Sequence, residues 1–180
     1  LTTPEKALAY SLVKEEPIRL AWPMSEERSA LRLNLLASLL ENAFYNISRK
    51  NSDIQFYEIG NVFLKNGEEA LPIEQEKIAG LLTGKANQSN WQATGEQIDF
   101  YYAKGILEGY FEKLGLEDQV RYEATSEITW MHPGRTAEVF LGEESSGYVG
   151  QVHPSVAKEY DLKDVYVYEL NFSTLVQALS

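Results

Sequence analysis

The spacing of apolar residues predicts one long helix in the first third of the chain. Between Ser25 and Asn51, apolar side chains recur every three or four residues, which is the period of an amphipathic helix. Ser25 can cap the first turn, and Glu26 and Glu27 oppose the positive end of the helix dipole. The main apolar row consists of Leu33, Leu36, Leu40, Ala43, Phe44 and Ile47, and a second row consists of Leu31, Leu35 and Leu39.

Two apolar rows on one helix leave two interpretations open. The helix either lies sandwiched inside its own domain, or it packs one row on its own core and presents the other row to a partner. A leucine row left in water would be an aggregation liability, so the pattern favours one of these two arrangements over an exposed row. The sequence pattern alone does not choose between them.

The rest of the chain alternates predicted strands and helices. Strand composition covers residues 53–64, 77–84, 119–125 and 165–172, and residues 136–152 read as a hairpin that turns near Ser145 to Gly147. Further helices are predicted near the N-terminus from Thr3, between Asp99 and Gly115, from Pro154, and from Ser173 as the N-cap of a closing helix. This order predicts one α+β domain over residues 1–180, an antiparallel sheet with helices on one face.

Composition narrows the classes of partner. The net charge of −11 and the pI of about 4.7 disfavour binding to nucleic acid or to anionic membranes. The chain has no cysteine, which excludes disulfides and thiolate metal sites and suits a reducing cytoplasm. No apolar run of the sequence approaches transmembrane length. We therefore expect a cytoplasmic protein without membrane contact.

Few residues suggest chemistry. His132 and His153 are each followed by proline, and without HxxxH or HExxH spacing we expect turn histidines that hydrogen-bond the backbone. Glu58 lies in the middle of a predicted strand, and Arg135 follows a glycine-containing turn that could hold an anion, although a structural arginine is the favoured interpretation. We predict no catalytic, cofactor-binding or metal-binding residue.

Four stretches of the sequence resemble the β subunit of bacterial phenylalanine–tRNA ligase, a phenylalanyl-tRNA synthetase, and they occur in the family's order. They are PMSEERSALRLNLLASLLENAFYNISR, FYEIGNVF, HPGRTAEVFLG, and GYVGQVHPSVAKEYDL followed by VYVYEL. Each stretch alone is a weak signal, and their order along the chain is what makes the resemblance specific.

The resemblance implies a fold and a set of partners. It points to the class II aminoacyl-tRNA synthetase core-like domain of the β subunit, an antiparallel sheet flanked by helices that has lost catalysis, with the first part of the module lying before Leu1. In this family the partners are the catalytic α subunit, a second β subunit in an (αβ)2 heterotetramer, and tRNA through the complex. The complex uses ATP and magnesium, and we expect no cofactor in this chain.

The resemblance also implies that the long helix lies at the subunit junction. We therefore predict that the second apolar row, Leu31, Leu35 and Leu39, contacts partner helices, with Arg28 and Arg32 near the rim.

A synthetase core needs arginines to stabilise the phosphate charge, one in an Arg-x-Glu setting and one in Gly-x-Gly-x-x-Arg. Here Phe56 stands two residues before Glu58, and the second pattern is absent from the sequence. We expect a non-catalytic assembly domain. One alternative is a degenerate core that binds an amino acid or adenylate in a relic pocket of Glu58, His132 and Arg135. Another is an accessory tRNA-binding module using Arg19, Arg28, Arg32, Arg49 and Lys50.

Overall fold

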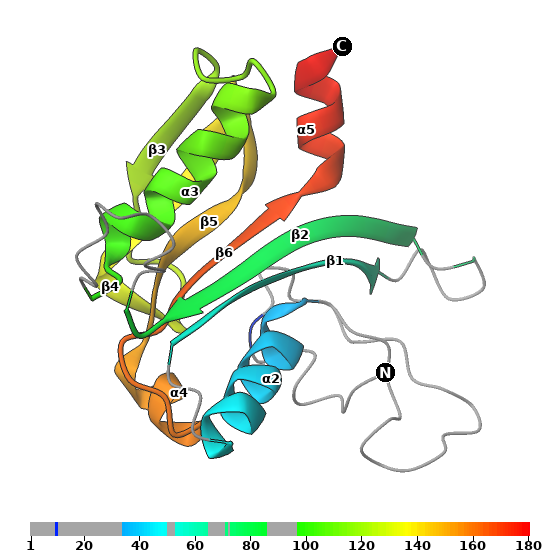
Figure 1. Ribbon diagram of the computed structural model, residues 1–180. Coiled ribbons are helices and arrows are strands. Elements are labelled where there is room, and N and C mark those ends of the chain that lie inside the picture. Colours follow the sequence, from blue (N-terminus) through cyan, green and yellow to red (C-terminus); the bar gives the residue numbers. More distant parts are fainter. Residues whose placement is uncertain (1–9, 11–33, 50–52, 65–70, 72, 86–96) are drawn as a thin grey trace.

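The computed structural model describes residues 10, 34–49, 53–64, 71, 73–85 and 97–180. A six-stranded antiparallel sheet forms its centre, with the strand order β1-β2-β6-β5-β4-β3 (Figure 1). The strands are β1 (Ile54–Leu64), β2 (Ile73–Thr83), β3 (Val120–Ala124), β4 (Met131–Leu141), β5 (Glu144–Val152) and β6 (Tyr166–Asn171).

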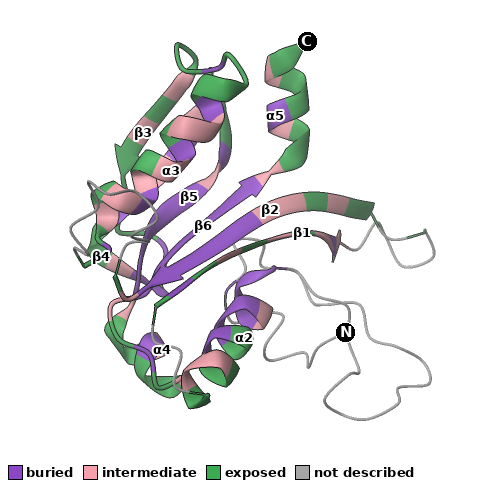
Figure 2. Ribbon diagram, in the orientation of Figure 1, coloured by how far each residue is buried: buried purple, intermediate pink, exposed green. Residues whose placement is uncertain are grey.

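Helices cover both faces of this sheet rather than the one face that the sequence predicted. The described helices are α2 (Leu36–Ser48), α3 (Phe100–Lys113), α4 (Pro154–Glu159) and α5 (Phe172–Leu179). One apolar core joins α2 and α4 to one face, and a second core joins α3 and α5 to the other (Figures 1 and 2). Every residue of β6 but its last is buried because β6 lies between the two cores.

The strand register separates side chains by face. Side chains alternate along a strand, and directly paired residues of neighbouring strands share a face. Glu58 pairs with Ala79, Ala79 with Glu169 and Glu169 with Tyr148, a row on the face that carries α2. Tyr57 pairs with Gly80 and Gly80 with Tyr168, a row on the face that carries α3.

Most predicted elements are confirmed, but some of them begin or end at other residues than predicted. Asp99 caps α3 by accepting a hydrogen bond from the backbone N–H of Tyr102 at 2.9 Å, and Gly115 follows the helix with a φ of +72°. The β4–β5 hairpin turns earlier than predicted, at Gly142 with a φ of +63°. Helix α5 begins at Phe172 with Asn171 as its N-cap, so the prediction of Ser173 as the cap is wrong.

The predicted long helix is shorter than its apolar pattern. Helix α2 begins at Leu36, and Asn34 and Leu35 lie outside it, so the prediction of one continuous helix from Ser25 is wrong. The side chain of Asn34 explains this start, because its Oδ1 accepts a hydrogen bond from the Ala37 N–H at 3.2 Å and satisfies a donor of the first turn. The helix predicted from Thr3 lies outside the described residues, apart from Tyr10.

Candidate functional site

The residues of the predicted relic pocket lie apart. Glu58 is on β1 at one edge of the sheet, whereas His132 and Arg135 are on β4, with β2, β6 and β5 between them. Four strand spacings of about 4.8 Å separate β1 from β4 by about 19 Å. The structure does not bring these three side chains together, and they do not form one pocket.

His132, His153 and Arg135 each have a structural partner nearby. The imidazole Nδ1 of His132 accepts a hydrogen bond from the Gly134 N–H at 3.0 Å, and that of His153 accepts one from the Ser155 N–H at 3.1 Å as the N-cap of α4. Arg135 donates to the Gln151 side-chain oxygen at 2.9 Å. The predicted backbone hydrogen bonds of the two histidines and the structural role of Arg135 are therefore confirmed, but His132 lies within β4 rather than in a turn.

The predicted interface row is wrong for two of its three leucines. Leu35 is 0% exposed and Leu39 is 1% exposed, and both pack in the domain's own core beside the sheet. A side chain without exposed area cannot contact a partner, so Leu35 and Leu39 pack inside their own domain, as the other interpretation expects. Arg28, Leu31 and Arg32 lie outside the described residues.

A buried ion pair holds the start of α2 on the sheet. Glu169 is 5% exposed, and its carboxylate lies 3.0 Å from the ammonium of Lys77 and accepts a hydrogen bond from the Leu35 N–H at 3.2 Å. In the same row, the carboxylate of Glu58 accepts from the hydroxyl of Ser38 at 3.1 Å. Two carboxylates thus meet the N-terminal turn of α2, where the helix dipole favours negative charge.

Sequence reasoning missed Glu169, although one signal was present. Glu169 is the one charged residue of VYVYELNF, an otherwise apolar and aromatic strand sequence. A charge in such a strand needs a partner, because burying an unpaired carboxylate is costly. The partner, Lys77, is more than 90 residues away in the chain, so the pair becomes visible only in the fold.

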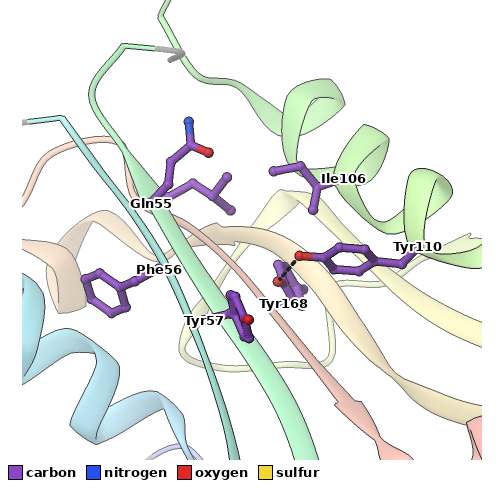
Figure 3. Close-up of a pocket in the computed structure, with 7 residues that line it drawn as sticks. Gln55, Phe56, Tyr57, Ile106, Tyr110 and Tyr168 are labelled. Carbon is purple, nitrogen blue, oxygen red and sulfur yellow. Dashed lines mark hydrogen bonds between the residues drawn. The ribbon is translucent and has the colours of Figure 1, made fainter. Parts of the chain in front are cut away.

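The opposite face of the sheet carries a tyrosine-lined hollow of about 150 Å³ (Figure 3). The hydroxyls of Tyr110 and Tyr168 hydrogen-bond at 3.2 Å, with their rings edge to face at 6.1 Å. Tyr57 forms an outer wall and is 65% exposed. We call this site the tyrosine hollow; it is lined by Gln55, Phe56, Tyr57, Leu82, Ile106, Tyr110 and Tyr168.

The tyrosine hollow is uncharged. No lysine, arginine, aspartate or glutamate is among the residues that line it. Burial, followed by the hydrogen bond with Tyr110, raises the pKa of Tyr168 well above its ordinary value and keeps its hydroxyl neutral. The ring of Phe56 packs against the core on the α2 side, away from Tyr57 (Figure 3). This site can offer aromatic faces and hydroxyl oxygens, but no charge to bind a phosphate.

A second hollow, of about 450 Å³, is acidic. Glu108, Glu112, Glu117, Val120 and Tyr122 line it. Burial, and then the charge of Glu108, raise the pKa of Tyr122 to about 12. Three carboxylates repel a phosphate group, so this hollow does not suit a nucleotide either. Within the described residues, no group of three or more His, Asp or Glu side chains is placed to hold a metal ion.

Solved structures share this fold. The chain is similar to pyrrolysyl-tRNA synthetase from Desulfitobacterium hafniense, with a TM-score of 0.62 and 15% identity over 98% of this chain and 61% of that one. A second structure, that organism's PylSc, gives a TM-score of 0.59 and 12% identity over 87% and 52%. At these identities the likeness shows the fold alone, a class II synthetase-like α+β core, as predicted.

Sequence comparisons give the family. The chain is 49% identical over 180 residues to the phenylalanine–tRNA ligase beta subunit of Geobacillus kaustophilus, covering 100% of this chain and 22% of that protein. It is 47% identical over 181 residues to that of Streptococcus pneumoniae strain R6, covering 99% and 22%. The chain thus spans about a fifth of these relatives. Residues 1–172 match the family model described as the phenylalanyl tRNA synthetase beta chain CLM domain, and the chain belongs to that family.

Proposed function

We propose that the chain is a non-catalytic assembly domain of a phenylalanine–tRNA ligase beta subunit. It packs against the catalytic α subunit in a cytoplasmic (αβ)2 enzyme that attaches phenylalanine to its tRNA with ATP. Membership of the beta chain CLM family supports the assignment to this subunit, and the relatives, which are phenylalanine–tRNA ligase beta subunits, support the reaction. Among the described residues, no helix has both the length and the apolar character needed to cross a bilayer.

One observation carries the non-catalytic role. Adenylation develops negative charge on a phosphate, and enzymes stabilise it with positioned cations or hydrogen-bond donors. Within the described residues, neither the tyrosine hollow nor the acidic hollow is lined by a lysine or an arginine. We therefore expect this domain to hold neither ATP nor magnesium and to leave the chemistry to the α subunit.

The surface of α5 supports a role in assembly. Val176 is 51% exposed and Leu179 is 53% exposed, and both border Leu175, which is buried in the second core. An apolar stripe that extends beyond the part of the helix buried in its own domain is typical of a helix that another element also covers. Phe172 extends the exposed row by one turn at 36% exposure, so we propose that another polypeptide of the enzyme packs on this face.

The test uses the full-length beta subunit expressed together with the α subunit. Lysine at Val176 and Leu179 should reduce the fraction that elutes as the heterotetramer, because a buried apolar contact would receive two charges. Gln177→Lys is the matched control, since Gln177 is exposed on the same helix between them. Equal assembly of Val176→Lys/Leu179→Lys and Gln177→Lys would show that this face is not a subunit contact.

Neither alternative function is favoured by the structure. A degenerate amino-acid or adenylate site would need Glu58, His132 and Arg135 together, and they lie on distant strands. For tRNA binding, the guanidinium of Arg49 stacks 4.3 Å from the ring of Tyr45 on its own helix, and the other basic residues proposed lie outside the described part. Magnesium-dependent, phenylalanine-stimulated ATP–pyrophosphate exchange by the separate beta subunit would overturn the non-catalytic role, and we expect none.

A further inference from the structure

We propose that the tyrosine hollow receives an arginine or lysine side chain of another polypeptide in the assembled enzyme. This inference rests on the proposed assembly function and adds to it the place of one contact and the chemistry of its partner.

Tyrosine side chains from three separate elements line the hollow. Tyr57 comes from β1, Tyr110 from α3 and Tyr168 from β6, and Ile106 closes the side beneath α3 (Figure 3). Three tyrosine rings around one hollow offer the negative faces of their π systems. Cations bind such faces within about 6 Å of the ring centre.

Oxygen atoms in the hollow can accept hydrogen bonds from the same cation. The Gln55 amide donates from its nitrogen to the Tyr102 hydroxyl at 3.1 Å, which leaves its carbonyl oxygen as an acceptor on the side of Ile106 (Figure 3). The paired hydroxyls of Tyr110 and Tyr168 retain lone pairs beyond their mutual hydrogen bond. A guanidinium or ammonium group carries only donors and therefore complements these acceptors.

The charge of the chain and the lining of the hollow favour a cation over an anion as the group that binds there. No lysine or arginine lines the hollow, and the chain carries a net charge of −11. Elsewhere the chain already places its own cations over aromatic rings, with Arg49 on Tyr45, Lys104 on Tyr122 and Arg121 on Phe140, at 4.3 to 4.7 Å. Among the described residues, no cation is placed over the three tyrosines of the hollow, and we propose that a partner supplies one.

Size selects a side chain over a free ligand. Sites for small molecules typically have volumes of about 300–1,000 Å³ and bury most of their ligand. The tyrosine hollow offers about 150 Å³, and its outer wall, Tyr57, is 65% exposed. This shape fits the head of one side chain whose polypeptide makes further contacts around the rim.

The first test places a photo-crosslinker in the complete enzyme. p-Benzoylphenylalanine replaces Tyr57 in the full-length beta subunit, with the same replacement at Tyr101, which is 76% exposed on α3, as the control. We expect the probe at position 57, and not the control, to crosslink to a peptide of another polypeptide with an arginine or lysine beside the modified residue. Crosslinks to an apolar segment, to tRNA or to no other polypeptide would overturn the proposal.

The second test separates the aromatic face from apolar area. Tyr57→Leu keeps an apolar side chain without a ring, and Tyr57→Phe keeps the ring. We expect Leu to raise the subunit dissociation constant by about 5- to 30-fold and Phe to change it by less than about twofold. Equal affinity of the Leu variant and the unmodified enzyme would overturn this inference. If the α5 lysine variant still failed to assemble, the proposed assembly function would stand.

Discussion

At the scale of single residues, Glu169 is the side chain that fixes the position of α2 on the sheet. It is buried beneath α2, and it pairs with Lys77 while accepting the Leu35 N–H. A buried pair contributes little net stability compared with apolar residues of the same shape, but removing one partner leaves a buried charge alone. The ion pair therefore fixes the position of α2 more than it stabilises the fold.

We predict that Glu169→Gln lowers the free energy of unfolding by about 3–5 kcal/mol, because the Lys77 ammonium loses its counter-charge in a buried setting. Urea unfolding followed by circular dichroism measures the change. Glu123→Gln is the control, since Glu123 pairs with Arg121 at 2.9 Å with both side chains about half exposed, and we expect a loss below about 1 kcal/mol. Equal losses for the two variants would contradict a special role for Glu169.

The raised pKa of Tyr122 predicts how the stability of the fold depends on pH. Its hydroxyl is buried without a hydrogen-bond partner in the described structure, and burial raises its pKa from 10.0 to about 12. Between pH 10 and 12 the unfolded chain therefore loses this proton more readily than the folded chain, so stability falls as the pH rises. Tyr122→Phe should reduce this decline and change little at pH 7. Unfolding midpoints at pH 7, 10 and 11.5 test it, and parallel curves for both proteins would disprove it.

At the scale of elements, Gly109 of α3 and Gly80 of β2 differ in the space around them. Among the described residues, a Cβ at Gly109 of α3 would meet nothing within 4 Å. A Cβ at Gly80 of β2 would collide with the ring of Tyr168, which crosses the strand there. Gly109 thus lowers the stability of helix α3, whereas Gly80 leaves room for the ring of Tyr168, which lines the tyrosine hollow.

We predict that Gly109→Ala stabilises the chain by about 0.8–1 kcal/mol, the difference in helix propensity between the two residues. Gly80→Ala should destabilise it and change the chemical shifts around Tyr168. Thermal unfolding and NMR spectra of both variants provide the measurement. A destabilising Gly109→Ala would show that something in the chain packs on this face of α3.

The elements also show how far sequence reasoning reaches. Local signals predicted β1, β6, the Asp99 cap of α3 and the Pro154 start of α4, because each depends on neighbouring residues. The direction in which α2 packs depends on the sheet, so Leu35 and Leu39 could not be assigned from helical spacing. The tyrosine hollow joins Tyr57, Tyr110 and Tyr168, which are more than 50 residues apart along the chain, and no local pattern indicates that they meet.

At the scale of the whole molecule, one sheet joins two cores. Leu40 lies in the core beneath α2 and Leu107 in the core beneath α3, each fully buried. The central strands β5 and β6 supply side chains to both cores. A substitution that disrupts the packing of one core should therefore also destabilise the other core.

We predict that Leu40→Ala and Leu107→Ala each lower the free energy of unfolding by about 3 kcal/mol, a usual loss for a buried leucine. We also predict that both variants unfold in one transition. Amide exchange of β1 and β3, the two edge strands, provides the readout. If Leu40→Ala accelerated exchange in β1 through a separate early transition while β3 kept its protection, the two cores would be independent.

The place of β6 has a consequence for how the protein is made. The chain first produces the β1–β2 hairpin, then the β3–β4–β5 meander, and only afterwards the strand that lies between them. Until residues 166–171 leave the ribosome, β2 and β5 each lack the neighbour that completes them. A nascent chain stalled before this point would carry two partial sheets with open, apolar edges, the kind of surface that aggregates or recruits chaperones. The last-made strand of the sheet is therefore the one that unites it.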